Sequence, residues 1–216
     1  MDKHLIYVGG MFESRKSALS LYIQQGLNEW CNVVTISLNK QLGSRSFYAE
    51  IGRIEKIIER HKPEMIVAHS LGAYIAANLG VNCPLVFLEP SLRITDIVLP
   101  NVEDNRYFDG IHTFDLSQEF IESLKTCPSI ENVSKKLRTG ENVFIFGAGR
   151  GGFKIAELYK ENITGCHYFF LPEADHNFSE ELDRQKILDL IKKRLDLMSP
   201  SRGGCTHRDS VRLEDR

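Results

Sequence analysis

Short apolar runs alternate with amphipathic segments along most of the chain. The runs are continuously apolar and rich in Val, Ile, Leu and Phe, whereas the segments between them place apolar residues at helical spacing. The runs are 5–8, 33–38, 65–68, 85–88, 142–146 and 168–171, and the helical segments are 15–30, 45–61, 71–79, 153–160 and 178–197. Continuous apolar runs are typical of strands buried on both faces of a parallel sheet. The pattern therefore predicts an α/β fold with a doubly wound, mostly parallel sheet.

Residues 91–140 interrupt this alternation. They contain no run typical of a parallel strand, and show instead a turn-rich part at 104–110 and helical patterns near 117–126 and 130–138. An insertion at this point of the chain is expected to lie over the carboxyl ends of the strands, where open α/β sheets bind ligands. We interpret it as a short helical cap. The alternative is an ordinary helical crossover with a loose lead-in.

The length of 216 residues suits one α/β domain with a substantial core and is too short for two. We assign residues 1–198 to this domain, with 91–140 as its cap insertion. Residues 199–216 carry no apolar pattern, and we expect them to form a disordered tail.

Charge and composition narrow the classes of function. The formal net charge of -2 at pH 7 lacks the basic excess of a domain that neutralises many phosphates, so we expect no nucleic-acid partner. No apolar run approaches the roughly 20 residues of a membrane span. The five cysteines are scattered without a CxxC pair, and the first apolar stretch is too short for a signal peptide. These features predict a cytoplasmic protein with reduced thiols; the oligomeric state is not predicted.

Ser70 is the first candidate for chemistry. The run Ala68-His69-Ser70-Leu71-Gly72 directly follows a predicted buried strand and opens a helix of small residues. It matches the Gly-x-Ser-x-Gly elbow, except that Ala68 replaces the first glycine; small residues flank such a serine because the turn is very tight. The alternative is a serine that caps the helix N-terminus. The position between strand and helix favours the nucleophile.

His176 is the candidate base. It lies in Ala174-Asp175-His176-Asn177-Phe178, after the last predicted strand and before the last helix. A histidine on that loop, after the serine in the chain, has the position of the residue that takes the proton from the nucleophile and returns it to the leaving group. His69 lies beside the serine, but neighbours on an elbow point in different directions, so we assign it a structural role.

These motifs together resemble the α/β-hydrolases, and the chain is close in size to the small bacterial serine esterases. The resemblance covers roughly residues 4–197, and Leu5–Met11 resembles the family's first-strand motif, with Gly9 at the usual histidine. It implies an oxyanion hole formed by the backbone N–H groups of Leu71 and Met11, with Gly10 as the alternative to Met11. It also implies cleavage of a small-molecule ester or thioester through an acyl-enzyme, without a metal or organic cofactor.

The triad acid departs from the family's pattern. In the family it usually follows the strand that matches 143–146, but residues 147–152 contain no carboxylate. Glu89, at the end of run 85–88, is our provisional acid, because some hydrolases place the acid there. The alternatives are a Glu89 that pairs with Arg93 or anchors a loop, and a serine–histidine dyad without an acid. Asp175 and Glu173 are near the histidine in sequence, but such neighbours rarely orient an imidazole.

Two other functions stay open. Gly147-Ala148-Gly149-Arg150-Gly151-Gly152 matches Gly-x-Gly-x-x-Gly after a strand and before a helix, and Glu173 lies about 20 residues further on, as in dinucleotide-binding folds. Its position argues against this function, because only one strand follows it. The missing acid also leaves open a non-catalytic binding protein with a hydrolase-like fold. The sequence does not reveal the acyl and alcohol groups of a substrate.

Overall fold

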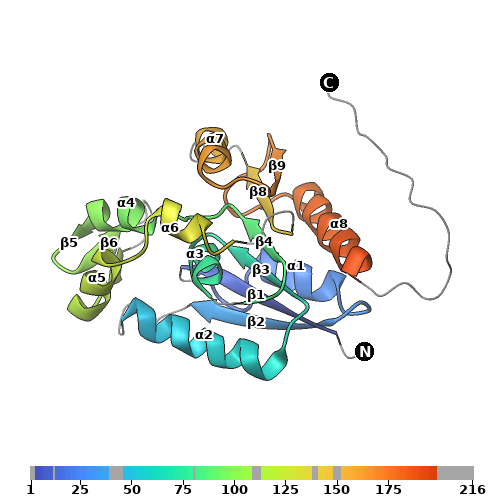
Figure 1. The fold of residues 1–216 in the computed structure, drawn as a ribbon, viewed down its shortest axis with the longest axis horizontal. Helices are drawn as coiled ribbons and strands as arrows, with labels where there is room; N and C mark the ends of the chain where they lie inside the picture. The colour runs from blue at the N-terminus through green and yellow to red at the C-terminus, as the bar shows by residue number, and fades with distance from the viewer. Residues whose placement is uncertain are drawn as a thin grey trace.

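Six parallel strands form the main sheet. The computed structural model describes residues 3–11, 13–38, 46–79, 81–108, 113–137, 141–147 and 152–198. The strand order is β2-β1-β3-β4-β8-β9, and every neighbouring pair is parallel (Figure 1). The strands are β1 (His4–Met11), β2 (Asn32–Leu38), β3 (Met65–His69), β4 (Leu85–Leu88), β8 (Val143–Gly147) and β9 (His167–Leu171). All six predicted strands are confirmed, and so is the doubly wound α/β sheet.

The strand order reverses between β1 and β3. The chain passes from β1 to β2 on one side and then returns to form β3 on the other side of β1. At such a switch point the connections leave in opposite directions, so that a crevice opens at the carboxyl ends of the strands. β1 ends in Gly9-Gly10-Met11, and β3 leads directly into Ser70.

Helices cover both faces of the sheet. They are α1 (Ala18–Gly26), α2 (Phe47–His61), α3 (Leu71–Asn78), α7 (Gly152–Asn162) and α8 (Glu181–Met198). Ser17 and Ser46 start α1 and α2, because each side chain accepts a backbone N–H from the first turn. α1 and α8 lie on one face of the sheet, and α2 and α3 lie on the other (Figure 1). None of the helices in these ranges has the length and hydropathy that a membrane span requires.

Each strand contributes to two hydrophobic cores. In β1, Ile6 and Val8 pack with α2 and α3, whereas Leu5 and Tyr7 pack with α1 and α8. All four side chains are fully buried. This alternation explains why β1 and the other central strands are continuously apolar in sequence, since both of their faces are covered. The edge strand β9 is also apolar, but Phe169 and Phe170 are exposed. The resulting two-sided core makes the sheet a rigid support for the loops at its carboxyl edge.

The insertion combines helices with a second, small sheet. Its elements are α4 (Ile94–Val98), η2 (Leu99–Asn101), β5 (Val102–Glu103), β6 (Arg106–Phe108), β7 (Thr113–Asp115), α5 (Gln118–Lys125) and α6 (Ile130–Ser134). The helix predicted near 117–126 is confirmed as α5, whereas the one predicted near 130–138 is shorter than expected, because α6 ends at Ser134. The antiparallel sheet β5-β6-β7 was not predicted, so a purely helical cap is an incomplete description. Strands of two or three residues are too short to show a period-two pattern.

Candidate active site

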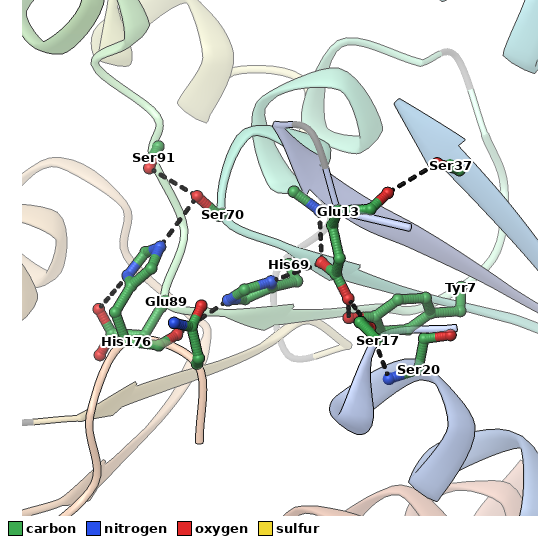
Figure 2. Close-up of polar contacts among 12 residues, drawn as sticks. Tyr7, Glu13, Ser17, Ser20, Ser37, His69, Ser70, Glu89, Ser91 and His176 are labelled. Atoms are coloured by element: carbon green, nitrogen blue, oxygen red, sulfur yellow. Dashed lines mark hydrogen bonds and ion pairs between the residues drawn. The ribbon is translucent and has the colours of Figure 1, made fainter. Parts of the chain in front are cut away.

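Ser70 occupies a strained turn between β3 and α3. Its backbone has φ 51° and ψ -118°, a conformation that residues with a side chain rarely adopt. Its side chain makes no capping hydrogen bond with α3, which argues against the alternative of a helix cap. Instead, Ser70 Oγ lies 3.1 Å from Nε2 of His176 (Figure 2). The geometry is that of a nucleophile elbow.

Gly72 allows this turn to pack against β1. A Cβ atom at Gly72 would lie 2.4 Å from the carbonyl oxygen of Val8 and 2.5 Å from that of Gly9. Both contacts are with backbone, which cannot move aside as a flexible side chain can. The last glycine of the motif is therefore required because the first turn of α3 lies directly on β1.

His176 is held between Ser70 and Glu89. Its Nε2 faces Ser70 Oγ, and its Nδ1 lies 3.4 Å from Oε2 of Glu89. Its side chain is 23% exposed, so that one edge of the ring remains open to the cavity beside it. A histidine in this arrangement can take a proton at Nε2 while the carboxylate fixes the hydrogen on Nδ1.

Asp175 shapes the histidine loop instead of orienting the ring. It accepts the backbone N–H groups of Asn177 and Ser179 and the Ser179 hydroxyl, at 3.1, 2.8 and 2.6 Å. Burial acts to raise the pKa of Asp175, but these hydrogen bonds outweigh it and hold the pKa below its ordinary value. Glu173 is exposed. The expectation that neither carboxylate orients the imidazole agrees with this geometry.

Glu89 is a buried carboxylate directed at the histidine. Its side chain is 6% exposed, and its backbone has a positive φ of 44°. One oxygen accepts the backbone N–H of Gly147, and the other faces His176. Arg93 pairs with Asp96, so the alternative of a Glu89–Arg93 pair does not hold. The structure thus brings Ser70, His176 and Glu89 together in the order of a catalytic triad.

Backbone donors for an oxyanion are expected at two places. Leu71 and Met11 both line the cavity that contains Ser70. The N–H of Gly10 already donates to Glu13 Oε2 at 2.7 Å, and this leaves Met11 as the better second donor. The oxyanion role of Leu71 and Met11 stays a prediction.

A cavity of about 430 Å³ adjoins the three side chains. This volume lies within the range of small-molecule sites, roughly 300–1,000 Å³. Residues of the insertion form one wall, and residues of α7 form another; they include Arg93, Ile94, Val98, Tyr107, Ile155 and Leu158. The insertion thus borders the cavity, and its role as a cap stays a prediction.

Two further polar residues lie behind the serine. His69 is 5% exposed, and its ring contacts the Glu13 carboxylate and the backbone carbonyl of His176. The structural role expected for His69 agrees with these contacts. Glu13 was not singled out from the sequence, because nothing in its local pattern distinguishes it from a surface carboxylate.

The glycine-rich run has a structural reason at its first position. A Cβ at Gly147 would lie 2.4 Å from the carbonyl oxygen of Ala174, and the Gly147 N–H is committed to Glu89. Residues 148–151 lie outside the described ranges. Over the part of the chain that the structure describes, no group of three His, Cys, Asp or Glu side chains could hold a metal ion.

Comparison with known proteins identifies the fold. No protein-family model and no curated protein matches the sequence. The structure is similar to Est1E from Butyrivibrio proteoclasticus, with a TM-score of 0.71 and 14% identity over 90% of this chain and 88% of that one. It is also similar to the esterase domain of a Rhodothermus marinus protein, with a TM-score of 0.69 and 12% identity over 89% of this chain and 85% of that one. A third similar structure is mouse alpha/beta hydrolase domain-containing protein 10, with a TM-score of 0.65 and 10% identity over 91% of this chain and 90% of that one. The chain therefore has the α/β-hydrolase fold.

Proposed function

We propose that this protein is a serine hydrolase that cleaves a small carboxylic ester or thioester through an acyl-enzyme. One observation carries the proposal: Ser70 Oγ, the His176 ring and the Glu89 carboxylate form a continuous row, with separations of 3.1 and 3.4 Å, beside a cavity of about 430 Å³. A serine that only caps a helix, or a histidine with only a structural role, would not require these two contacts in sequence.

The proposed reaction has two halves. Ser70 Oγ attacks the carbonyl carbon while His176 Nε2 takes its proton, and the Leu71 and Met11 N–H groups stabilise the oxyanion. One such donor contributes about 3–4 kcal/mol in another enzyme. His176 then protonates the leaving alcohol or thiol. A water molecule, deprotonated by His176, attacks the acyl-enzyme and releases the acid and Ser70. Glu89 stabilises the imidazolium that forms in each half.

The cavity favours an apolar group on the substrate. Ile94, Val98 and Tyr107 of the insertion face it together with Ile155 and Leu158 of α7. We propose that the insertion sets the preference for the acyl or alcohol group. Names of similar structures support an ester: one is an esterase domain, and another is Est1E with ferulic acid bound.

Labelling with a fluorophosphonate probe tests the proposal. The purified full chain is compared with Ser70→Ala, His176→Ala and the control Ser134→Ala, whose hydroxyl only donates to Glu131 within α6. We expect wild type and Ser134→Ala to react and the other two variants to lose labelling. A folded wild type that does not react would overturn the hydrolase and favour a non-catalytic binding protein with this fold.

A further inference from the structure

A largely buried polar network lies behind the nucleophile, and its members Glu13, Ser17 and His69 border a cavity other than the proposed substrate cavity. At its centre is the carboxylate of Glu13, in the loop that follows β1 (Figure 2). One oxygen accepts the hydroxyls of Tyr7 and Ser17, at 2.8 and 2.5 Å. The other accepts the Gly10 N–H at 2.7 Å and contacts His69 Nδ1 at 2.8 Å. Four partners thus surround one carboxylate, which is the environment of an ionised group.

His69 has an acceptor at each of its ring nitrogens. Nδ1 faces the Glu13 carboxylate, and Nε2 lies 2.9 Å from the backbone carbonyl oxygen of His176. A carbonyl oxygen can only accept, and an ionised carboxylate can only accept, so both ring nitrogens must carry hydrogen. His69 is therefore an imidazolium paired with Glu13 inside the protein.

The electrostatics of the two groups agree with this pairing. Burial acts to raise the pKa of Glu13, but the hydrogen bond and charge of His69, with help from Ser17 and the Gly10 N–H, lower it to about 2. Burial acts to lower the pKa of His69, but the hydrogen bond and charge of Glu13 and the His176 carbonyl raise it above its ordinary value.

The network joins three loops that the proposed reaction needs. Glu13 holds the backbone at Gly10, next to the expected oxyanion donor Met11. His69 directly precedes Ser70 and holds the carbonyl of His176. We propose that Glu13 and His69 are positioning residues, whose ion pair fixes the oxyanion loop, the nucleophile elbow and the histidine loop relative to one another. This inference rests on the proposed hydrolase function.

Fold stability alone does not account for the pair. Replacing a buried ion pair by apolar residues of similar volume is often neutral or stabilising, because desolvation offsets the attraction of the charges. The location also has a catalytic consequence. The His69 ring centroid is 5.2 Å from that of His176, which itself becomes a cation when it takes the serine proton. Glu13 balances the charge of His69, so that His176 is not protonated beside an uncompensated cation.

The pair should act on the reaction and not on substrate binding. The described residues that line the substrate cavity include Ser70 and His176, but neither Glu13 nor His69. Removing the pair would therefore leave the apolar side chains of the cavity in place and disturb mainly the alignment of the reacting groups. A misplacement of about 1 Å can lower a rate roughly 100-fold. The expected signature is a lower kcat with an unchanged KM.

Steady-state hydrolysis of p-nitrophenyl butyrate by the full chain tests this signature. The variants are Glu13→Gln, His69→Gln and the double variant, assayed at a temperature where circular dichroism shows each to be folded. We expect kcat to fall roughly 10- to 100-fold in each single variant, with KM within about twofold of wild type. The double variant should be no slower than the slower single variant, because the two residues act as one unit.

Glu50→Gln is the matched control. Glu50 is also a buried carboxylate, 6% exposed, but it pairs with Arg53 on α2 and lines none of the cavity that contains Ser70. We expect it to lose stability and to keep its kcat. Wild-type kcat in folded Glu13→Gln and His69→Gln would overturn the inference, and so would an equal loss of kcat in Glu50→Gln. Neither outcome would contradict the proposed hydrolase function. A wild type that hydrolyses no ester would overturn both.

The charge of His69 can be observed without catalysis. Nitrogen-15 spectra of histidine-labelled protein distinguish a ring with two N–H groups from a neutral ring. We expect His69 to be doubly protonated at pH 7 in wild type and to lose this signature in Glu13→Gln. A neutral His69 ring in the folded wild type would overturn the ion pair.

Discussion

Glu89→Gln tests whether the carboxylate after β4 is the triad acid. The glutamine has nearly the same shape, and its amide oxygen can still accept the N–H of Gly147, as the Glu89 carboxylate does. Its NH₂ group would then face Nδ1 of His176 at the present 3.4 Å. Two donors cannot bond each other, so the imidazole must move its hydrogen to Nε2, where it can no longer accept the Ser70 proton.

The expected loss follows from this change of tautomer. In other triads the equivalent carboxylate-to-amide change lowers kcat about 10⁴-fold, which corresponds to about 5.4 kcal/mol of transition-state stabilisation. The longer contact with His176 leads us to expect roughly 10³- to 10⁴-fold here. The assay is ester hydrolysis by the full chain, with thermal unfolding as the check of folding. Glu173→Gln is the control, because Glu173 is exposed on the histidine loop and should keep wild-type activity. Folded Glu89→Gln with more than about a tenth of wild-type kcat would refute Glu89 as the acid and favour a dyad.

Three further outcomes can be measured. Gly72→Ala should lower the free energy of unfolding in urea by about 3 kcal/mol, the upper end of the usual range for overpacking, because its Cβ would lie 2.4 Å from a carbonyl oxygen of β1. Gly52→Ala in α2 meets no atom within 4 Å and should stabilise by about 0.5–1 kcal/mol; equal effects would contradict the packing argument. Leu158→Trp should shift ester preference toward shorter acyl chains, since Leu158 lines the cavity; an unchanged chain-length profile would contradict the assignment of this wall. The depressed pKa of Glu13 contributes stability that is lost as the pH falls from about 4.5 toward 2. The raised pKa of His69 contributes stability that is fully present below pH 6.5 and is lost as the pH rises through the pKa of His69 in the folded protein. The unfolding free energy of wild type should thus fall at both ends, and an identical pH profile for Glu13→Gln would contradict the pairing.

The sheet could be predicted because its central strands, β1, β3, β4 and β8, are buried on both faces. Such strands give unbroken apolar runs, and all six runs became strands of the main sheet. Ser70 and His176 could be singled out as candidates, because each combines a residue of suitable chemistry with a fixed place after a strand, and the structure brings the two side chains together. The strands of the insertion were missed because β5, β6 and β7 have only two or three residues each. They exist because tertiary contacts stabilise them and not because of a local pattern.

Side-chain contacts that depend on strand pairing could not be predicted from the sequence. Glu13 and His69 are 56 residues apart, and they meet because β1 pairs with β3 in a register that sets Val8 beside Ala68. Nothing in the local sequence of either residue specifies that register. The sequence also could not decide whether Glu89 pairs with Arg93 or faces His176. That depends on the direction of the Glu89 side chain, which tertiary contacts set.

The place of Glu89, the proposed acid, follows from the same register. His69 pairs with Leu88, so the residues that follow them, Ser70 and Glu89, leave neighbouring strands at the same level of the sheet. β8 pairs with β4 on the other side and provides the Gly147 N–H that supports the Glu89 carboxylate. An acidic side chain at position 147 would not fit, because a Cβ at Gly147 would lie 2.4 Å from the carbonyl oxygen of Ala174. The last glycine of β8 and the glutamate after β4 therefore depend on each other: the close approach of the histidine loop leaves no room for a side chain at Gly147, and the Gly147 N–H holds the Glu89 carboxylate beside His176.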